Sequence, residues 1–129
     1  MATEEYMTSQ TYDIDIGATV YSVTVSMGNT VAATLPANTA TADDTSPTVL
    51  GVNILYLPAN TVATAITQLD NGASNQMVIL VCTSSTNSPT IADGGNFALN
   101  GNWSPNADDT LTLISQNGSA WREICRSAN

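Results

Sequence analysis

The chain has 129 residues, a formal net charge of −9, and neither histidine nor lysine. This length suits one domain, or two small lobes, and is sufficient to bury a hydrophobic core. Arg122 and Arg126 are the only cations. The chain therefore lacks the clustered positive charge that binding to nucleic acids or to anionic membranes requires, and we expect neither as a partner. Without histidine or lysine, Ser-His-Asp, Cys-His and Schiff-base catalysis are excluded, and zinc binding is nearly so.

The composition predicts an all-β protein. Thr, Ser, Asn and Ala fill the positions between Val, Ile and Leu, and helix formers are scarce. No run of about 18 apolar residues is present, and Glu4 and Glu5 stand where a signal peptide would carry positive charge. We therefore expect short strands and polar turns in a protein made and assembled in a cytoplasm, with no cofactor.

The N-terminal residues 1–11 predict a flexible arm, because they show no periodicity and few apolar groups. Tyr6 and Met7 are its only candidate anchors, and Tyr12 opens the first alternating run. We interpret these three residues as candidate docking groups for a larger partner.

Two alternating runs follow the arm, at residues 12–16 and 21–27, and a third short strand is predicted at 30–35, before Pro36. This pattern is typical of a meander or a small sandwich. We assign residues 12–64 to an N-terminal β lobe that docks to a partner.

A short repeat lies within this part of the chain, because the segment LPANT at 35–39 recurs at 57–61. We interpret it as a repeated turn, with two stacked β-rungs as the alternative. Residues 49–57 predict a central strand, whereas 62–69 are too short for periodicity to distinguish a helical turn from a strand.

The buried strand of the second half is predicted at residues 77–83. It contains Cys82, which we expect to behave as a small buried hydrophobe. A disulfide between Cys82 and Cys125 is the less favoured alternative, because a cytoplasmic origin opposes it.

The C-terminal stretch predicts a β-hairpin. Thr110 and Thr112 alternate with Leu111 and Leu113, and Asn117-Gly118 then predicts a tight type I′ turn before Trp121. The large apolar side chains of this hairpin would cover a neighbouring surface.

Several segments of this region also form a recognisable series, which consists of 66–72, 75–80, Phe97-Ala98-Leu99, Asp108-Asp109-Thr110-Leu111-Thr112-Leu113 and Trp121-Arg122-Glu123-Ile124-Cys125-Arg126-Ser127. The series resembles the C-terminal β module of bacteriophage virion appendage proteins, of the tail spike, tail fibre, head fibre or capsid decoration type. It covers residues 66–129 and departs from the family at Asp108, where glycine is usual. The resemblance implies a homotrimer on the virion surface, with residues 65–129 as the projecting module.

The fold that we predict consists of small antiparallel β-sandwich or β-prism-like lobes in a homotrimer. Full-length spikes carry a long shaft or an enzymatic domain, and the shortness of this chain favours a capsid decoration (cement) protein or a short head fibre. Its partners would be itself and the major capsid protein or another virion protein. The alternative is a tail fibre or spike adhesion module that binds host-surface glycans.

The predicted self-association residues are Trp121, Arg122, Glu123, Ile124 and Arg126. They hold all the positive charge of an acidic chain, so copies that meet around an axis would place the arginines against the acids of a neighbour. Trp121 is expected in the core or between subunits.

Trp103 is the candidate ligand platform, because its polar neighbours Asn102 and Ser104 suggest an exposed ring on which a sugar could stack. Once catalysis by histidine and lysine is excluded, carboxylates are the remaining candidate catalytic groups. The pairs Asp43-Asp44 and Asp108-Asp109 lack glycosidase geometry, since adjacent strand residues point to opposite faces, and we predict that the protein is not an enzyme.

Calcium binding is a weaker alternative that the sequence leaves open. Its candidate oxygen donors are Asp13, Asp15, Asp43, Asp44, Asp93 and Asn96. They show no EF-hand spacing, so the site would require two loops to meet.

Overall fold

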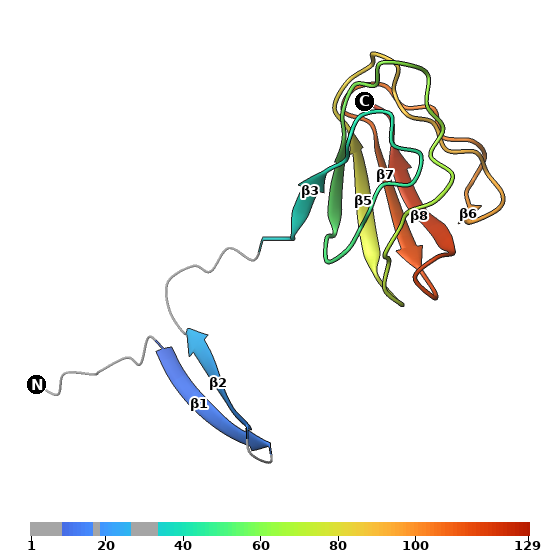
Figure 1. The fold of residues 1–129 in the computed structure, drawn as a ribbon. Helices are drawn as coiled ribbons and strands as arrows, with labels where there is room; N and C mark the ends of the chain where they lie inside the picture. The colour runs from blue at the N-terminus through green and yellow to red at the C-terminus, as the bar shows by residue number, and fades with distance from the viewer. Residues whose placement is uncertain (1–8, 17–18, 27–33) are drawn as a thin grey trace, which may run out of the picture. The chain divides into compact units, whose positions relative to one another are not determined.

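The described part of the chain consists of strands and loops. The computed structural model describes residues 9–16, 19–26 and 34–129, and every regular element within them is a β-strand (Figure 1). The all-β prediction is therefore confirmed. The chain divides into two compact units, Met1–Thr34 and Leu35–Asn129, which we call unit 1 and unit 2.

Unit 1 contains an antiparallel hairpin of β1 (Ser9–Ile16) and β2 (Thr19–Ser26). Both predicted strands are confirmed. β1 begins inside the segment 1–11 that was expected to be a flexible arm, because Ser9 pairs with Ser26 across the hairpin. The predicted docking residues Tyr6 and Met7, and nearly all of the predicted strand 30–35, lie outside the described residues.

Unit 2 is built on one six-stranded sheet with the order β3-β4-β5-β7-β8-β6. Its strands are β3 (Ala37–Thr39), β4 (Ile54–Leu57), β5 (Met77–Cys82), β6 (Phe97–Ala98), β7 (Thr110–Ser115) and β8 (Trp121–Ser127). β3, β4 and β5 run parallel, β7 is antiparallel to both β5 and β8, and β6 is parallel to β8.

The mixed sheet corrects the prediction of antiparallel lobes. Parallel neighbours need long crossover connections, and here residues 40–53 and 58–76 provide them. The isolated parallel bridge from Thr48 to Asp70 links these two crossovers, and a second one, from Ala65 to Thr90, links the second crossover to the connection after β5. The chain in this region therefore coils, and each turn lies on the one before it.

The repeated LPANT segments occupy different places in this coil. Thr39 on β3 pairs with Tyr56 on β4, and the next residue, Ala40, donates its backbone N–H to the Tyr56 carbonyl. Leu57 is therefore level with Ala40 and not with Leu35. The predicted repeated turn is wrong, because the first copy runs into β3 whereas the second follows the end of β4. β3 and β4 do lie side by side in parallel, but the two copies do not occupy equivalent positions.

The boundary between the two units also differs from the predicted one. We expected it between residues 64 and 65, but β4 and β5 lie on opposite sides of that point and pair directly with each other. The structural division falls between Thr34 and Leu35. Strand pairing across residue 64 makes all of 35–129 one unit.

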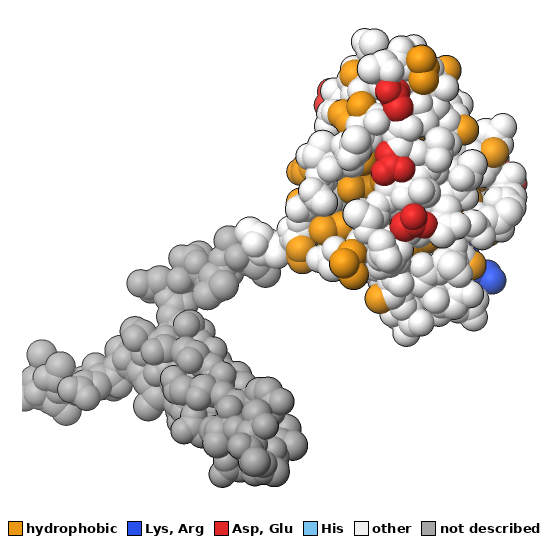
Figure 2. Space-filling view, viewed as in Figure 1, with side chains coloured by type: hydrophobic (Ala, Val, Ile, Leu, Met, Phe, Trp, Pro, Cys, Tyr) orange, Lys and Arg blue, Asp and Glu red, His pale blue; other side chains and the backbone are white. Residues whose placement is uncertain are grey.

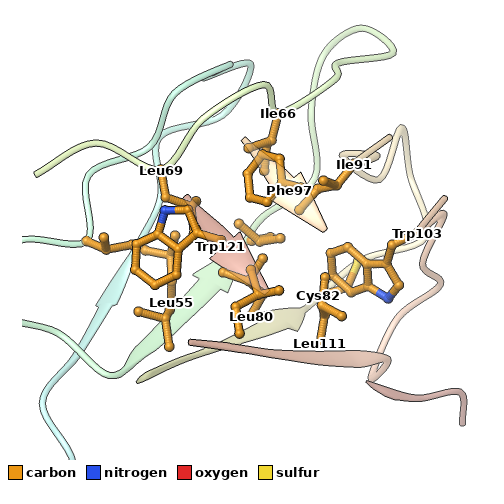
Figure 3. Packing of buried hydrophobic residues seen from close by; sticks show 14 residues of the cluster. Leu55, Ile66, Leu69, Leu80, Cys82, Ile91, Phe97, Trp103, Leu111 and Trp121 are labelled. Atoms are coloured by element: carbon orange, nitrogen blue, oxygen red, sulfur yellow. The ribbon is translucent and has the colours of Figure 1, made fainter. Parts of the chain in front are cut away.

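The hydrophobic core lies on one face of the sheet (Figure 3). Strand residues that point to this face alternate with residues that do not, and loop residues cover them in place of a second sheet. The core consists of Val49, Leu55, Leu57, Ile66, Leu69, Val78, Leu80, Cys82, Ile91, Phe97, Trp103, Leu111, Leu113 and Trp121. Cys82 is buried as predicted; it and the exposed Cys125 are free thiols.

The connection between β7 and β8 is longer than predicted. Gly118 has a positive φ of 89°, but Asn117 does not, so the turn is not the type I′ turn that we expected. The reason is that β7 ends at Ser115 and β8 begins only at Trp121. The Asn117 side chain closes the longer loop by accepting the N–H groups of Ser119 and Ala120, at 3.0 and 2.8 Å.

Asp108 adopts a positive φ of 71°. This left-handed conformation carries no steric penalty for glycine and a small one for aspartate.

Candidate functional site

The five residues predicted for self-association are divided between the two faces of β8. Leu113 pairs with Glu123 and Thr112 pairs with Cys125, so the ladder shifts at this point and Ile124 has no partner opposite it. Such a β-bulge inserts one residue and reverses the alternation beyond it. As a result, Glu123 and Arg126 both fall on the core side of the sheet, opposite Leu113 and Leu111.

Trp121 belongs to the core of its own chain. Its side chain is 1% exposed, and its ring lies where the backbones of Gly72 and Gly118 meet. The indole N–H has no hydrogen-bond partner among the described residues. Of the two predicted locations for Trp121, the structure selects the core, and this ring does not belong to a surface between copies.

Glu123 and Arg126 form a two-bonded ion pair within the chain. Arg126 Nε and Nη2 each lie 2.6 Å from a carboxylate oxygen of Glu123. The same guanidinium donates to the carbonyl oxygens of Gly101, at 3.0 Å, and Asn102, at 3.2 Å, and Glu123 accepts the Asn100 N–H at 2.7 Å. The pair therefore holds the loop after β6 against the end of the core.

This arrangement corrects the expectation that Arg126 meets an acid of a neighbouring copy. The hydrogen bond from Arg126 lowers the pKa of Glu123, and the same bond raises the pKa of Arg126. Both charges are thus stabilised by partners inside the protomer, and the pair is structural.

Arg126→Gln is expected to lower the free energy of unfolding by about 2 kcal/mol, because it removes charge-assisted hydrogen bonds and leaves the carboxylate of Glu123, which is mostly buried, without its partner. Equilibrium unfolding in urea measures this difference. Arg122→Gln is the matched control, since Arg122 is exposed and no ion pair to it is found in the described part of the chain. Equal losses in the two variants would contradict the assignment of a structural role to Arg126 alone.

The other face of the sheet is open to solvent in unit 2, and we call it the open face. On β4, β5, β7 and β8 it consists of Ile54, Tyr56, Met77, Ile79, Val81, Thr110, Thr112, Ile114, Arg122, Cys125 and Ser127, each of which keeps part of its surface exposed. These residues alternate with core residues along their strands. None of them is acidic, although the chain contains eleven Asp and Glu.

The register places the side chains of the open face in rows across the strands. Met77 is level with Ile114 and Arg122. The next rows are Ile54, Ile79, Thr112 and Cys125, and then Tyr56, Val81, Thr110 and Ser127. Near one end, Ile114 and Arg122 border a shallow hollow of about 340 Å³ that also involves Asn75 and Gln116. The rows form a continuous apolar and hydroxyl-bearing surface.

The sequence analysis did not identify this surface, although β5 contained a signal for it. Met77, Ile79 and Val81 are apolar on the side of β5 opposite the core, so the strand is hydrophobic at every position. An uninterrupted apolar run is typical of a strand that is covered on both faces. The predicted strand at 77–83 is thus buried on its core side only, and the side that carries Met77, Ile79 and Val81 is partly exposed.

Trp103 is not the exposed platform that its polar neighbours suggested. It is 3% exposed, and its backbone exchanges hydrogen bonds with Ile91 at 2.8 and 2.9 Å. Figure 3 shows its ring at the end of the core marked by Cys82 and Leu111, away from Trp121. The bridge to Ile91 turns the indole inward while the flanking Asn102 and Ser104 remain exposed.

The aspartate pairs have structural partners in their loops. Asp43, with a positive φ of 63°, accepts the backbone N–H groups of Thr61 at 2.8 Å and Val62 at 3.3 Å. Asp109 accepts the N–H groups of Asn106 at 2.9 Å and Asn129 at 2.7 Å. These carboxylates join segments that are far apart in the chain, Asp43 to the loop at Thr61 and Asp109 to the C-terminal Asn129.

The calcium candidates Asp44 and Asp93 of unit 2 also have separate partners in their own loops. Asp93 accepts the Leu99 N–H at 2.8 Å, and Asp44 accepts the Ser46 N–H at 2.9 Å. Within residues 34–129, no three acidic or cysteine side chains gather closely enough to hold a metal ion. Figure 2 shows acidic side chains distributed over the viewed surface of unit 2.

The pH dependence of stability follows from these carboxylates. The Thr61 hydroxyl bond lowers the pKa of Asp43, and the Asn106 N–H bond lowers the pKa of Asp109, each below the ordinary value of 3.8. The unfolded chain then binds protons at a higher pH than the folded chain, so this stabilisation is present above about pH 4 and is lost as pH falls through the folded pKa values.

We therefore expect Asp109→Asn to reduce the loss of stability between pH 5 and the acid limit, relative to the unmodified chain. Urea midpoints measured across this range test the difference between the two proteins. The comparison is needed because protonation of other carboxylates also relieves the repulsion within a chain of charge −9. Parallel acid profiles for the two proteins would contradict the role of Asp109.

Comparisons with protein-family models, with curated proteins and with solved structures found no match for this chain. In the part of the chain that the structure describes, no helix is long and apolar enough to span a bilayer.

Proposed function

We propose that the chain is a structural, non-enzymatic protein on the outside of a bacteriophage virion, and specifically a trimeric capsid decoration (cement) protein or a short head fibre. The observation that supports this proposal is the arrangement of the segments that resemble phage appendage modules. β7, β8 and β6 carry three of those segments and are adjacent in one sheet. The motif around β8 then has a structural explanation.

Four residues of that motif have a role in the folding of unit 2. Trp121 fills the core, Glu123 and Arg126 hold the loop after β6, and Ile124 supplies the bulge that brings both charges to one side. A module of this kind needs no reactive group. It offers a rigid β surface on a small body, which is what a shell-stabilising protein requires.

The role of such a protein is mechanical. A protein that binds only the assembled shell stabilises it by mass action, by about 2.7 kcal/mol per site when its free concentration is 100 times the dissociation constant. We assign docking to unit 1, including Tyr6, Met7 and Tyr12, because a two-stranded hairpin such as β1–β2 is only marginally stable by itself in water. The major capsid protein or another virion protein would be its partner, and the assembled particle forms in the host cytoplasm.

Host-glycan adhesion is not retained as a second function, because the ring on which it depended belongs to the core. Trp103 is buried and cannot stack on a sugar without unfolding its surroundings.

The test is made on particles of the source phage. Mass spectrometry of purified virions should detect the chain, and purified full-length protein should co-sediment with particles from which it has been depleted. Depleted particles should release their genome at a lower temperature, and addition of the protein should restore the original temperature. Absence from virions together with no binding to depleted shells would overturn the proposal. Binding to host cells in place of particles would overturn it in favour of adhesion.

A further inference from the structure

The open face of the sheet in unit 2 has the properties of a covered surface. Tyr56 is 38% exposed and Met77 44% exposed, and half-buried Ile54, Ile79 and Val81 lie around them. Large contiguous apolar patches are rare on monomeric proteins and mark sites of interaction. Since β5 is apolar on both sides, its composition fits a strand with a covering layer on each.

The charge of the face restricts what can cover it. The whole chain carries −9, yet the open face has no acid and only Arg122 as a cation. A basic partner would be attracted to the acidic surfaces elsewhere and not to this face. The complementary occupant is an uncharged, flat, apolar β surface.

A second copy of this chain presents such a surface. We propose that the open face is the surface on which copies of this chain pack against one another, with the open faces of the three copies of the proposed trimer turned toward a common axis. Two strongly acidic chains that met elsewhere would bring carboxylates together, whereas contact between open faces leaves the acids of both copies outside. Facing sheets pack about 10 Å apart with interdigitated side chains, and the rows of the open face supply those side chains.

This inference replaces the surface that the sequence predicted for self-association. Inside the protomer, the core buries Trp121, and Glu123 and Arg126 form an ion pair with each other. Arg122 remains on the open face, and Ile124 is exposed at the bulge beside it. It stands on the burial and charge of unit 2, independently of the virion location proposed above.

The test compares two double variants of the full-length chain. Tyr56→Glu with Met77→Glu places two charges on the open face. Leu50→Glu with Val62→Glu is the matched control, because these residues are 72% and 60% exposed, lie in loops, and receive the same change in charge. Sedimentation velocity over a range of concentrations measures the mass of each protein, and the emission of the two buried tryptophans confirms that each is folded.

We expect the unmodified chain and the Leu50/Val62 variant to sediment as the same multiple of 13.4 kDa. The Tyr56/Met77 variant should dissociate, with a dissociation constant raised by about 100-fold or more, since its carboxylates would be buried without partners. Equal dissociation of both variants, or none in the Tyr56/Met77 variant, would overturn the proposal.

A second measurement uses the thiol of Cys125, which lies on the open face, with buried Cys82 as an unreactive internal reference. A bulky maleimide should label Cys125 slowly in the unmodified chain and rapidly in the Tyr56/Met77 variant. If the unmodified chain is a monomer, the proposal is overturned, whatever the rate at which Cys125 is labelled. Slow labelling of Cys125 in that monomer would show that another part of the same chain covers the open face. Virion binding by a monomer would leave the proposed place on the virion intact and would remove only the trimeric state, so the two failures are distinguishable.

Discussion

Gly118→Ala is expected to lower the free energy of unfolding by about 3 kcal/mol, which is more than the loss expected for Gly51→Ala. Gly118 has a φ of 89°, and a Cβ built on it would collide with the backbone carbonyl oxygen of Gly72. A left-handed alanine costs about 1–2 kcal/mol, and forcing apart two packed backbones adds a cost of similar size. Equilibrium unfolding in urea measures the sum.

Gly51→Ala separates the two contributions. Gly51 has a comparable φ of 68°, but a Cβ there would meet no atom within 4 Å. We expect this variant to lose only the conformational part, about 1 kcal/mol. If Gly51→Ala proved as damaging as Gly118→Ala, the close approach of Gly72 and Gly118 would not be a determinant of stability.

The same contact explains how the β7–β8 connection is fixed to the rest of unit 2. A Cβ on Gly72 would collide with the Gly118 carbonyl oxygen and lie 2.7 Å from Cζ2 of Trp121. The two glycines therefore let the connection lie directly on the loop before β5, with the indole of Trp121 beside them. A side chain at either glycine would push the β7–β8 connection away from the indole of Trp121.

Trp103→Ala is expected to lower the free energy of unfolding by about 3–5 kcal/mol, because it removes a buried indole and leaves a cavity at one end of the core. A solvent-exposed ligand platform would respond differently, since its truncation would abolish binding and leave stability unchanged. Thermal and urea unfolding of the variant therefore distinguish the two roles without knowledge of any ligand.

Leu50→Ala serves as the control for the tryptophan variant, because its side chain is large, apolar and exposed. Its effect should stay within about 0.5 kcal/mol, as for most surface substitutions. A Trp103→Ala protein as stable as Leu50→Ala would show that the indole does not support the core.

The alternation of residues along the chain located most of the strands. The alternating runs at 12–16 and 110–113 correspond to β1 and β7, because successive side chains of a strand point to opposite faces. The continuous apolar run at 77–83 corresponds to β5. The same local rule cannot choose a strand's neighbour. Parallel pairing of β3, β4 and β5 depends on where long crossovers lead, and these carry no short-range pattern.

The candidate site was less accessible to sequence reasoning than the strands were. On β8, strict alternation would place Glu123 and Arg126 on opposite faces, but the bulge at Ile124 places them on one. For Trp103, polar neighbours indicated exposure, whereas the pairing of its backbone with Ile91 directed the ring inward. One inserted residue or one bridge changes the face to which a side chain points, and the local sequence pattern predicts neither of them.

The sequence by itself determined the acidic, cation-poor character of the chain, its β composition and the positions of its principal strands, because charge and a two-residue period are local properties. Only the tertiary structure decided which indoles are buried, which arginine is engaged, and that one face of the sheet is free of acids. Those properties depend on register and on which loops cover which face, and both are set by contacts between residues far apart in the chain.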